Sequence, residues 1–302
     1  SSFIVRIVMP DHKDHIVLGC ACTVMATFLF GVMAMAGKLL TEQHHPVEIV
    51  FYRYVIPLLP LLVFMIWRRG RGVFTVRERG ASVGLFLRCV CGVMAMGMHV
   101  AALMYLPIAD EKVISFTSSL FTPVIAYFIL KEHFGLRRFA AILIGFGGVI
   151  LIAGPTGNIH FLGLGFALVA ALMDAGMITT LRYLKRENAL TITFYLSVFG
   201  SVAAGVFMPF VAQPFVGMME VLLMLLVSLC GLGAQLCMTY ASRFAPSAVV
   251  APFMYTSLIW AIIFDMAIWS NVPTLTVILG AVIIIGANLF ILYREQKSNV
   301  TH

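Results

Sequence analysis

The sequence predicts an all-α membrane protein in which ten transmembrane helices form two inverted five-helix repeats, with both termini in the cytoplasm. The prediction rests on the apolar composition, the placement of the charges and an internal repeat. Of the 302 residues, 61% are hydrophobic and 11% carry a formal charge, against about 25% charged residues in soluble domains. The mean hydropathy is +1.02. Such a chain has too little polar surface to cover a water-soluble globule, which argues against soluble enzymes, nucleic-acid-binding proteins and disordered proteins.

Continuous apolar runs, separated by charges, Gly and Pro, define the predicted helices. A bilayer core of about 30 Å needs about 20 apolar residues per helix. The predicted spans are 15–40, 46–67, 81–106, 111–130, 136–153, 162–184, 189–212, 217–240, 248–269 and 273–293. The segments between them are short, so no sizeable domain is expected outside the membrane.

The basic residues give the orientation. Sixteen of the 20 Lys and Arg lie at the N-terminus, in the even-numbered loops or at the C-terminus: Arg6, Lys13, Arg68, Arg69, Arg71, Arg77, Arg79, Lys131, Arg137, Arg138, Arg182, Lys185, Arg186, Arg243, Arg294 and Lys297. Lys38 and Lys112 lie at the opposite ends of helices, and Arg53 and Arg88 lie inside spans. By the positive-inside rule this bias puts both termini in the cytoplasm and supports an even helix count. The net charge of +7 is therefore a topology signal, and no nucleic-acid partner is expected. The basic loop 68–79 can also contact anionic lipid headgroups.

The two halves repeat one another. Each second helix contains Phe-Tyr (Phe51-Tyr52 and Phe194-Tyr195), and each fifth helix is rich in glycine. Because five is odd, the second half must enter the membrane from the opposite side, as in many secondary transporters. The predicted organisation is a cytoplasmic segment 1–14, a first repeat 15–153, a loop 154–161, a second repeat 162–293 and a cytoplasmic tail 294–302.

The end of each half carries a resemblance to a known family. The first half ends in FTSSLFTPVIAYFILKEHFGLRRFAAILIGFGGVILIAGP, and the second in APFMYTSLIWAIIFDMAIWSNVPTLTVILGAVIIIGANLF. With Lys131-Glu132 followed by a glycine-rich helix, the sequence resembles the drug/metabolite transporter superfamily, in its EamA-type ten-helix branch, over residues 15–293. It departs from the pattern at Asn271, where the family usually has Glu, and at Ser119, near a usual Pro.

The resemblance implies a secondary transporter of the inner or plasma membrane, with a central cavity and alternating access, driven by a proton gradient or by exchange. Some details are similar to the subgroup for S-adenosylmethionine or riboflavin uptake. The family commonly has a basic residue at the position of Arg53. The sequence has no nucleotide-binding domain and no catalytic motif, so the chain is not expected to be an enzyme or to use ATP directly.

Ionisable side chains in the spans are the first candidate site residues, because each costs about 2.5–3.5 kcal/mol at the centre of a membrane helix. Arg53 either binds an anionic group of the substrate through its guanidinium fork or pairs with Glu48. Arg88 and His99 share one helix face, three turns apart. Arg88 either lines the cavity or extends to the headgroups. His99 either carries protons or bonds neighbouring helices.

The two intramembrane aspartates are expected to differ. Asp174 lies at the middle of the sixth predicted span with no basic residue within a turn. It either couples transport to protons and binds a substrate ammonium, or it pairs with Arg53 or Arg88. Asp265 lies nearer the external end of the ninth span, where it is expected to be solvated at the cavity mouth.

Hydroxyl and aromatic side chains complete the predicted binding site. A polar stripe with helical spacing, expected to face the interior, is formed by Ser115, Ser118, Ser119 and Thr122. The alternative is packing between helices by small residues. In the ninth span, Tyr255 and Trp260 can stack on a planar substrate.

No metal site, disulfide or cofactor is predicted, because the two C-x-C pairs point their thiols to different helix faces. The predicted function is secondary transport of a small polar metabolite, zwitterionic or amphoteric, such as an amino acid, an S-adenosylmethionine-like or a vitamin-like compound. The alternatives are a lipid-handling flippase and an exporter of drugs and metabolites with broad specificity. The expected partners are the substrate, membrane lipid and protons, and the chain is expected to act as a monomer or homodimer.

Overall fold

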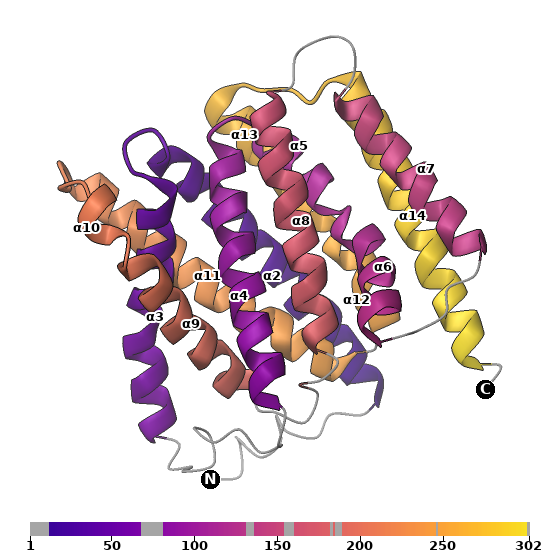
Figure 1. The fold of residues 1–302 in the computed structure, drawn as a ribbon, viewed down its shortest axis with the longest axis horizontal. Helices are drawn as coiled ribbons and strands as arrows, with labels where there is room; N and C mark the ends of the chain where they lie inside the picture. Colours follow the sequence, from indigo (N-terminus) through magenta and orange to yellow (C-terminus); the bar gives the residue numbers. More distant parts are fainter. Residues whose placement is uncertain are drawn as a thin grey trace.

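The computed structural model describes residues 12–67, 81–130, 136–153, 160–181, 184, 189–245 and 247–300. Within these ranges the regular structure is entirely helical (Figure 1). The helices are α2 (His12–Leu40), α3 (Pro46–Trp67), α4 (Ala81–Leu103), α5 (Ile108–Ser115), α6 (Ser118–Leu130), α7 (Leu136–Ala153), α8 (Phe161–Leu181), α9 (Ala189–Gly205), α10 (Met208–Val211), α11 (Met218–Phe244), α12 (Ser247–Met254), α13 (Thr256–Trp269) and α14 (Leu275–Val300). The basic segment 68–80 and most of the predicted inter-repeat loop lie outside the described residues.

Six helical stretches of the described chain are long and apolar enough to cross a membrane. Three shorter apolar helices cover Phe139–Ile152, Leu190–Gly205 and Leu275–Ile291. Large apolar side chains such as Leu59, Ile150 and Val282 are mostly exposed on the outer faces of the bundle. An apolar exterior is what lipid requires, because it offers no hydrogen-bond partners. The chain is therefore built as a helical membrane protein.

Three of the predicted spans are not continuous helices, because each consists of two helices. The fourth span breaks at Phe116 and Thr117, between α5 and α6, and the ninth breaks at Tyr255, between α12 and α13. At both breaks the backbone switches to bonds between residues three apart, such as Thr117 N–H to Ile114 O at 2.9 Å. In the seventh span, α9 ends at Gly205 and α10 begins at Met208, with Pro209 in its first turn, because proline cannot continue a helix.

Asn288 of α14 stabilises the first break. Its amide donates to the Phe116 carbonyl at 3.0 Å. The Phe116 and Tyr255 rings meet edge to face, with centroids 4.9 Å apart. The two helix breaks, one from each half of the chain, therefore lie against one another inside the bundle.

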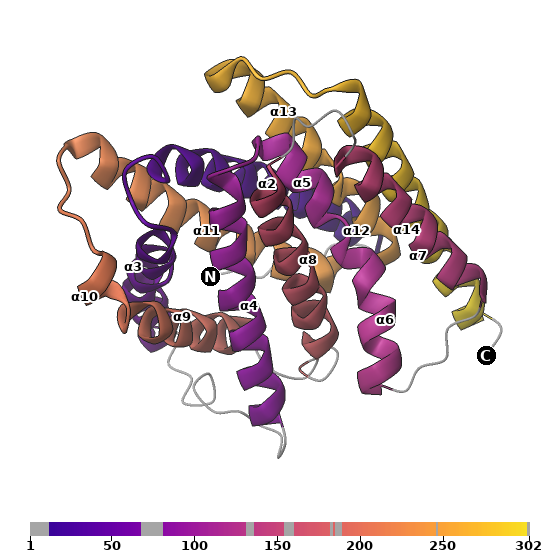
Figure 2. The same cartoon turned by 45° about the horizontal axis from the view of Figure 1, so that its top comes forward.

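The principal helix contacts join the two halves of the chain. The most extensive pairs are α2 with α11, α4 with α8, α14 with α7, and α3 with α9. Figures 1 and 2 both place α7 beside α14 along one flank and α3 beside α9 along the other. The α7–α14 pair is close because Gly148 and Gly280 face each other: a Cβ built on Gly148 lies 3.0 Å from the Gly280 carbonyl. The glycines predicted in the fifth and tenth spans thus allow backbone-to-backbone packing.

Candidate functional site

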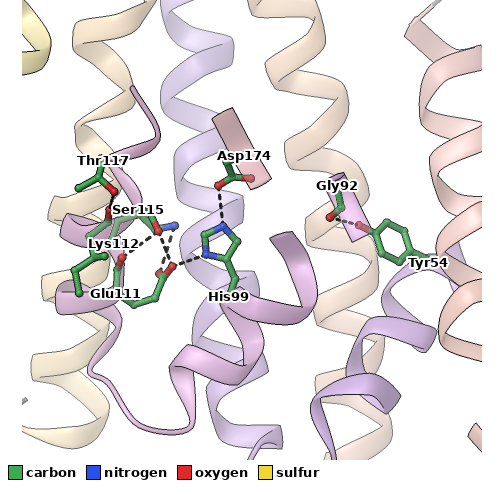
Figure 3. Close-up of polar contacts among 9 residues, drawn as sticks. Tyr54, Gly92, His99, Glu111, Lys112, Ser115, Thr117 and Asp174 are labelled. Atoms are coloured by element: carbon green, nitrogen blue, oxygen red, sulfur yellow. Dashed lines mark hydrogen bonds and ion pairs between the residues drawn. The ribbon is translucent and has the colours of Figure 1, made fainter. Parts of the chain in front are cut away.

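A carboxylate–imidazole–carboxylate arrangement, here called the His99 clamp, lies within the bundle (Figure 3). The His99 Nδ1 atom lies 2.5 Å from Oε1 of Glu111, and Nε2 lies 2.8 Å from Oδ2 of Asp174. The three side chains come from α4, α5 and α8. The Glu111 side chain is 2% exposed, whereas those of His99 and Asp174 are 21% and 24% exposed. One end of the clamp is therefore deeply buried and the other is accessible.

The number of protons in the clamp follows from its geometry. A carboxylate oxygen and a bare ring nitrogen cannot share a hydrogen bond unless one of them carries a proton. Two such contacts need two protons among His99, Glu111 and Asp174. The three groups then carry one negative charge in total, whether the imidazole holds both protons or one carboxylate holds one. Removing a proton breaks a contact and adding one weakens a contact by neutralising a carboxylate, so the clamp links protonation to the contacts between α4, α5 and α8.

Ser115 and Lys112 hold the Glu111 carboxylate in place. The Ser115 hydroxyl donates to Glu111 Oε1 at 2.6 Å, one turn along α5. The Lys112 ammonium lies 3.7 Å from Glu111 Oε2. Glu111 therefore has partners at both oxygens, which orients it toward His99. Figure 3 shows the three side chains gathered beside the imidazole.

The expectation that Asp174 pairs with an arginine was wrong. Its partner is His99, and among the described residues neither Arg53 nor Arg88 contacts it. The physical reason is that the imidazole reaches the Asp174 carboxylate from α4, the principal helix packed on α8. His99 is thus confirmed as a bond between helices, while its role as a proton carrier stays a prediction.

Arg53 lies buried between α2, α3 and α11. Its exposed fraction is 7%, and its Nε atom donates to the Met33 Sδ atom at 3.4 Å. Gly231 of α11 makes room for the guanidinium, since a Cβ there would overlap it. The expected pair with Glu48 was wrong, because Glu48 binds His44 at 3.0 Å instead. Arg53 has no carboxylate partner in the described part of the chain.

Arg88 does not extend to the headgroups, so that alternative was wrong. The residue is 3% exposed, and Nη1 donates to the Met177 carbonyl of α8 at 3.3 Å. Its Nε atom is buried without a hydrogen-bond partner among the described atoms. Arg88 therefore faces inward, toward the same helix that carries Asp174.

Asp265 is not solvated, in contrast to the expectation. It is 1% exposed, because α5 covers it: the Ala109 N–H donates to Asp265 Oδ2 at 2.7 Å. The Lys38 ammonium lies 3.6 Å from Oδ1. The aspartate thereby joins α13 to α2 and α5.

The predicted hydroxyl stripe is only partly internal. Ser115 is buried, Ser118 and Thr122 are half-buried, and Ser119 is exposed. The expectation was wrong for Ser119, because the break at Phe116 and Thr117 alters the register between α5 and α6.

The two aromatic candidates of the ninth span have different surroundings. Tyr255 contacts Phe116 at the helix break. Trp260 packs edge to face on Phe28, with centroids 5.1 Å apart, and its indole nitrogen is buried without a partner among the described atoms. The role of both rings in stacking on a substrate stays a prediction.

Glu111 was missed as a site residue, because it begins the predicted fourth span and reads as a residue of the membrane edge. A signal for it exists. His99 and Glu111 flank the turn at Leu106-Pro107, and two antiparallel helices joined by a short turn bring residues at similar distances from it together.

The comparisons with known proteins agree with this architecture. The model of the EamA-like transporter family matches residues 17–154 and again residues 161–293. The chain belongs to the EamA-like transporter family. This membership and the apolar helices make it a multi-pass protein of the inner or plasma membrane, and they point to a transporter rather than an enzyme. The resemblance to the drug/metabolite transporter superfamily is thereby confirmed.

Several relatives match along most of their length. Solute carrier family 35 member G1 of Mus musculus is 29% identical, over 89% of this chain and 76% of its own length. The S-adenosylmethionine uptake transporter of Rickettsia prowazekii is 27% identical, over 87% of this chain and 88% of its own. A crystal structure of a protein 12% identical matches with a TM-score of 0.60, over 91% of this chain and 95% of that one. The last similarity concerns the fold alone.

Proposed function

We propose that the chain is a proton-coupled secondary transporter for a small polar metabolite that carries an ammonium or similar cationic group, alone or with an anionic group. The His99 clamp carries this proposal. It holds two carboxylates and an exchangeable proton within the helical bundle, and intramembrane ionisable groups at such places serve ion and substrate pathways. The uptake named for the Rickettsia relatives involves a substrate of this class.

The proton count gives the coupling step. A substrate cation competes with the imidazolium for Asp174, the accessible end of the clamp. When the cation pairs with Asp174, the imidazole loses the acceptor of its Nε2–H group, so that proton is released or moves to Glu111. Release leaves the buried groups with the same single negative charge as before the cation bound. Arg53, which lacks a carboxylate partner among the described residues, is free to bind an anionic end of the same substrate.

The proposed topology has ten crossings in two inverted halves, residues 15–153 and 162–293, with both termini in the cytoplasm. The helix contacts support it. Exchanging the two halves converts the α2–α11 contact into the α8–α4 contact and leaves the α3–α9 and α7–α14 pairs unchanged. Contacts that exchange in this way are expected of a two-fold axis lying in the membrane plane. Accessibility of tags fused to each terminus in oriented vesicles tests the orientation.

The decisive experiment is uptake of radiolabelled S-adenosylmethionine into proteoliposomes, between about pH 5.5 and 8, where imidazole titrates. The compound is chosen from the relatives' name. We expect an inward proton gradient to change the uptake rate, and Asp174→Asn to abolish this response. Glu42→Gln is the matched control, since it removes a carboxylate on an exposed loop. An unchanged pH response in Asp174→Asn would remove the clamp from coupling.

A further inference from the structure

A cavity of about 460 Å³ lies where α4 passes into α5 and α13 into α14. These two connections are at the upper end of the bundle in Figure 1. The cavity is separate from the His99 clamp. Its polar lining includes Tyr105, Asp110, Asp265, Asn271 and Thr274. The remaining walls are mainly apolar. A cavity of this volume fits a small metabolite, since ligand sites measure about 300–1,000 Å³.

Asp110 is the unexplained group of this cavity. It is 9% exposed and lines the cavity wall. Within the described part of the chain it makes no hydrogen bond and no ion pair at contact distance, although Lys38 acts on it from farther away. Its carboxylate therefore depends on whatever fills the cavity, water or a ligand, for its hydrogen bonds. The Asp110 side chain therefore borders the open cavity and has no hydrogen-bond partner among the described residues.

The neighbouring charges leave this space negative. Asp265 has its Oδ2 atom bonded to the Ala109 N–H at 2.7 Å and its Oδ1 atom 3.6 Å from the Lys38 ammonium. Lys38 also lies over the Trp269 ring, 4.7 Å from its centroid. The Lys38 ammonium is thus the one positive charge beside two carboxylates, those of Asp265 and Asp110. Because Lys38 pairs with Asp265, the remaining negative charge lies on Asp110.

We propose that this cavity is an admission site for a small organic cation bearing an ammonium group, held by Asp110 and apolar contacts. Two walls of different chemistry suit such a ligand, because the carboxylate pairs with the ammonium while Tyr105 and the apolar residues cover its carbon body. A bare metal ion fits poorly, since Ca²⁺ needs six to eight oxygen ligands and the cavity lining offers two carboxylates.

The site deepens the proposed function and rests on it for its place in the transport path. Asp110 and Glu111 are neighbours on α5: the first faces the cavity and the second faces His99. A cation that leaves Asp110 is therefore close to the next carboxylate of the clamp. Recruitment at Asp110 would raise the local concentration of cationic substrate before it reaches Asp174.

The pKa of the Asp110 carboxyl sets the pH range in which the cavity attracts cations. Burial, and next the charge of Asp265, raise the pKa of the Asp110 carboxyl to about 6, while Lys38 opposes the increase. The carboxylate is therefore charged above about pH 6, and attraction of cations is lost as the pH falls through that value. These are the charged groups that face Asp110 from α2 and α13.

The test measures the charge preference of the cavity without requiring transport. A single cysteine is introduced by Asn271→Cys, at an exposed position of the lining, after the six free native cysteines have been replaced. The probes are 2-aminoethyl methanethiosulfonate, which is cationic, and 2-sulfonatoethyl methanethiosulfonate, which is anionic. Each rate is divided by the rate with a free thiol in solution at the same pH.

We expect the cationic probe to react roughly tenfold faster than the anionic one, because opposite potentials act on the two probes near an unpaired carboxylate. Asp110→Asn should remove most of this preference, Asp110→Glu should retain it, and Glu42→Gln should leave it unchanged. Butylammonium should slow the labelling, whereas butanol should not. The preference should also decline below about pH 6.

Equal rates for the two probes, or a preference that survives Asp110→Asn, would overturn the proposal. Uptake in proteoliposomes separates this result from the proposed function. A charge preference without uptake would refute the transport proposal and leave the cation site standing. Proton-coupled uptake without a charge preference would refute the cation site alone.

Discussion

The His99 clamp predicts an unusually large interaction energy between His99 and Glu111. The perturbation is a double-mutant cycle with His99→Leu, Glu111→Met and the double variant, and a second cycle with His99→Leu and Asp174→Leu. Removing one partner of a buried charged pair leaves the other uncompensated and costs about 3–5 kcal/mol, whereas replacing both by apolar groups is often nearly neutral. The costs of the single changes should therefore not add.

The magnitudes follow from burial. Glu111 is 2% exposed and contacts the ring at 2.5 Å, so we expect a coupling energy above about 2 kcal/mol, as for hydrogen bonds with a charged partner. His99 and Asp174 are 21% and 24% exposed, so screening should reduce their coupling to about 1 kcal/mol. Neutral hydrogen bonds in a helical membrane protein give about 0.6 kcal/mol and at most about 1.7.

The assay is equilibrium unfolding of the purified protein in mixed micelles with increasing sodium dodecyl sulfate, followed by circular dichroism. The neutral bond between Thr27 and Thr256, with oxygens 2.7 Å apart, serves as the internal standard through Thr27→Val and Thr256→Val. If His99 and Glu111 couple no more strongly than these threonines, the clamp does not hold a charge and the proton count drawn from its geometry is refuted.

Two further predictions concern neighbouring features of the fold. Gly231→Ala should displace the Arg53 guanidinium, lower the free energy of unfolding by about 1 kcal/mol or more and impair substrate binding. Gly97→Ala is the control, because a Cβ there meets no atom within 4 Å. Melting temperature and equilibrium substrate binding measure the two effects, and equal results for both variants would contradict the packing of Gly231 against Arg53. Asn288→Leu should lower the free energy of unfolding by about 1 kcal/mol. The Phe116 carbonyl loses the amide donor at 3.0 Å and keeps only the longer bond of 3.2 Å from the Ser119 N–H. An unchanged unfolding curve would show that the helix break needs no support from α14.

Hydropathy predicted where the helices lie but not where they break. The second predicted span, 46–67, coincides with α3, because length and apolar content alone define a spanning helix. The break at Phe116 has no proline or glycine beside it. It depends on Asn288, which lies far away in the sequence and reaches the Phe116 carbonyl only after α14 has packed. Tertiary contacts of this kind leave no local signal.

The sequence identified two residues of the candidate site but not which side chains contact one another. His99 and Asp174 were identified from the cost of ionisable groups in lipid, and the structure brings them together. Their third partner, Glu111, and the cavity residue Asp110 lie at the edge of a span, where a carboxylate carries no such cost. Burial at that edge arises because α13 covers the start of α5, through the bond between Ala109 and Asp265, and hydropathy cannot detect it.

The short helix α5 connects these features physically. Its first turn is bonded to Asp265 of α13, and the carbonyl just beyond its last turn is bonded to Asn288 of α14. Between these two attachments to the second half of the chain it carries Asp110 toward the cavity and Glu111 toward His99. A change of charge at either carboxylate therefore acts on a helix that is held at both ends by the opposite half. On the proposed function, we therefore expect protonation of the clamp and occupation of the cavity to act, through α5, on how the two halves pack.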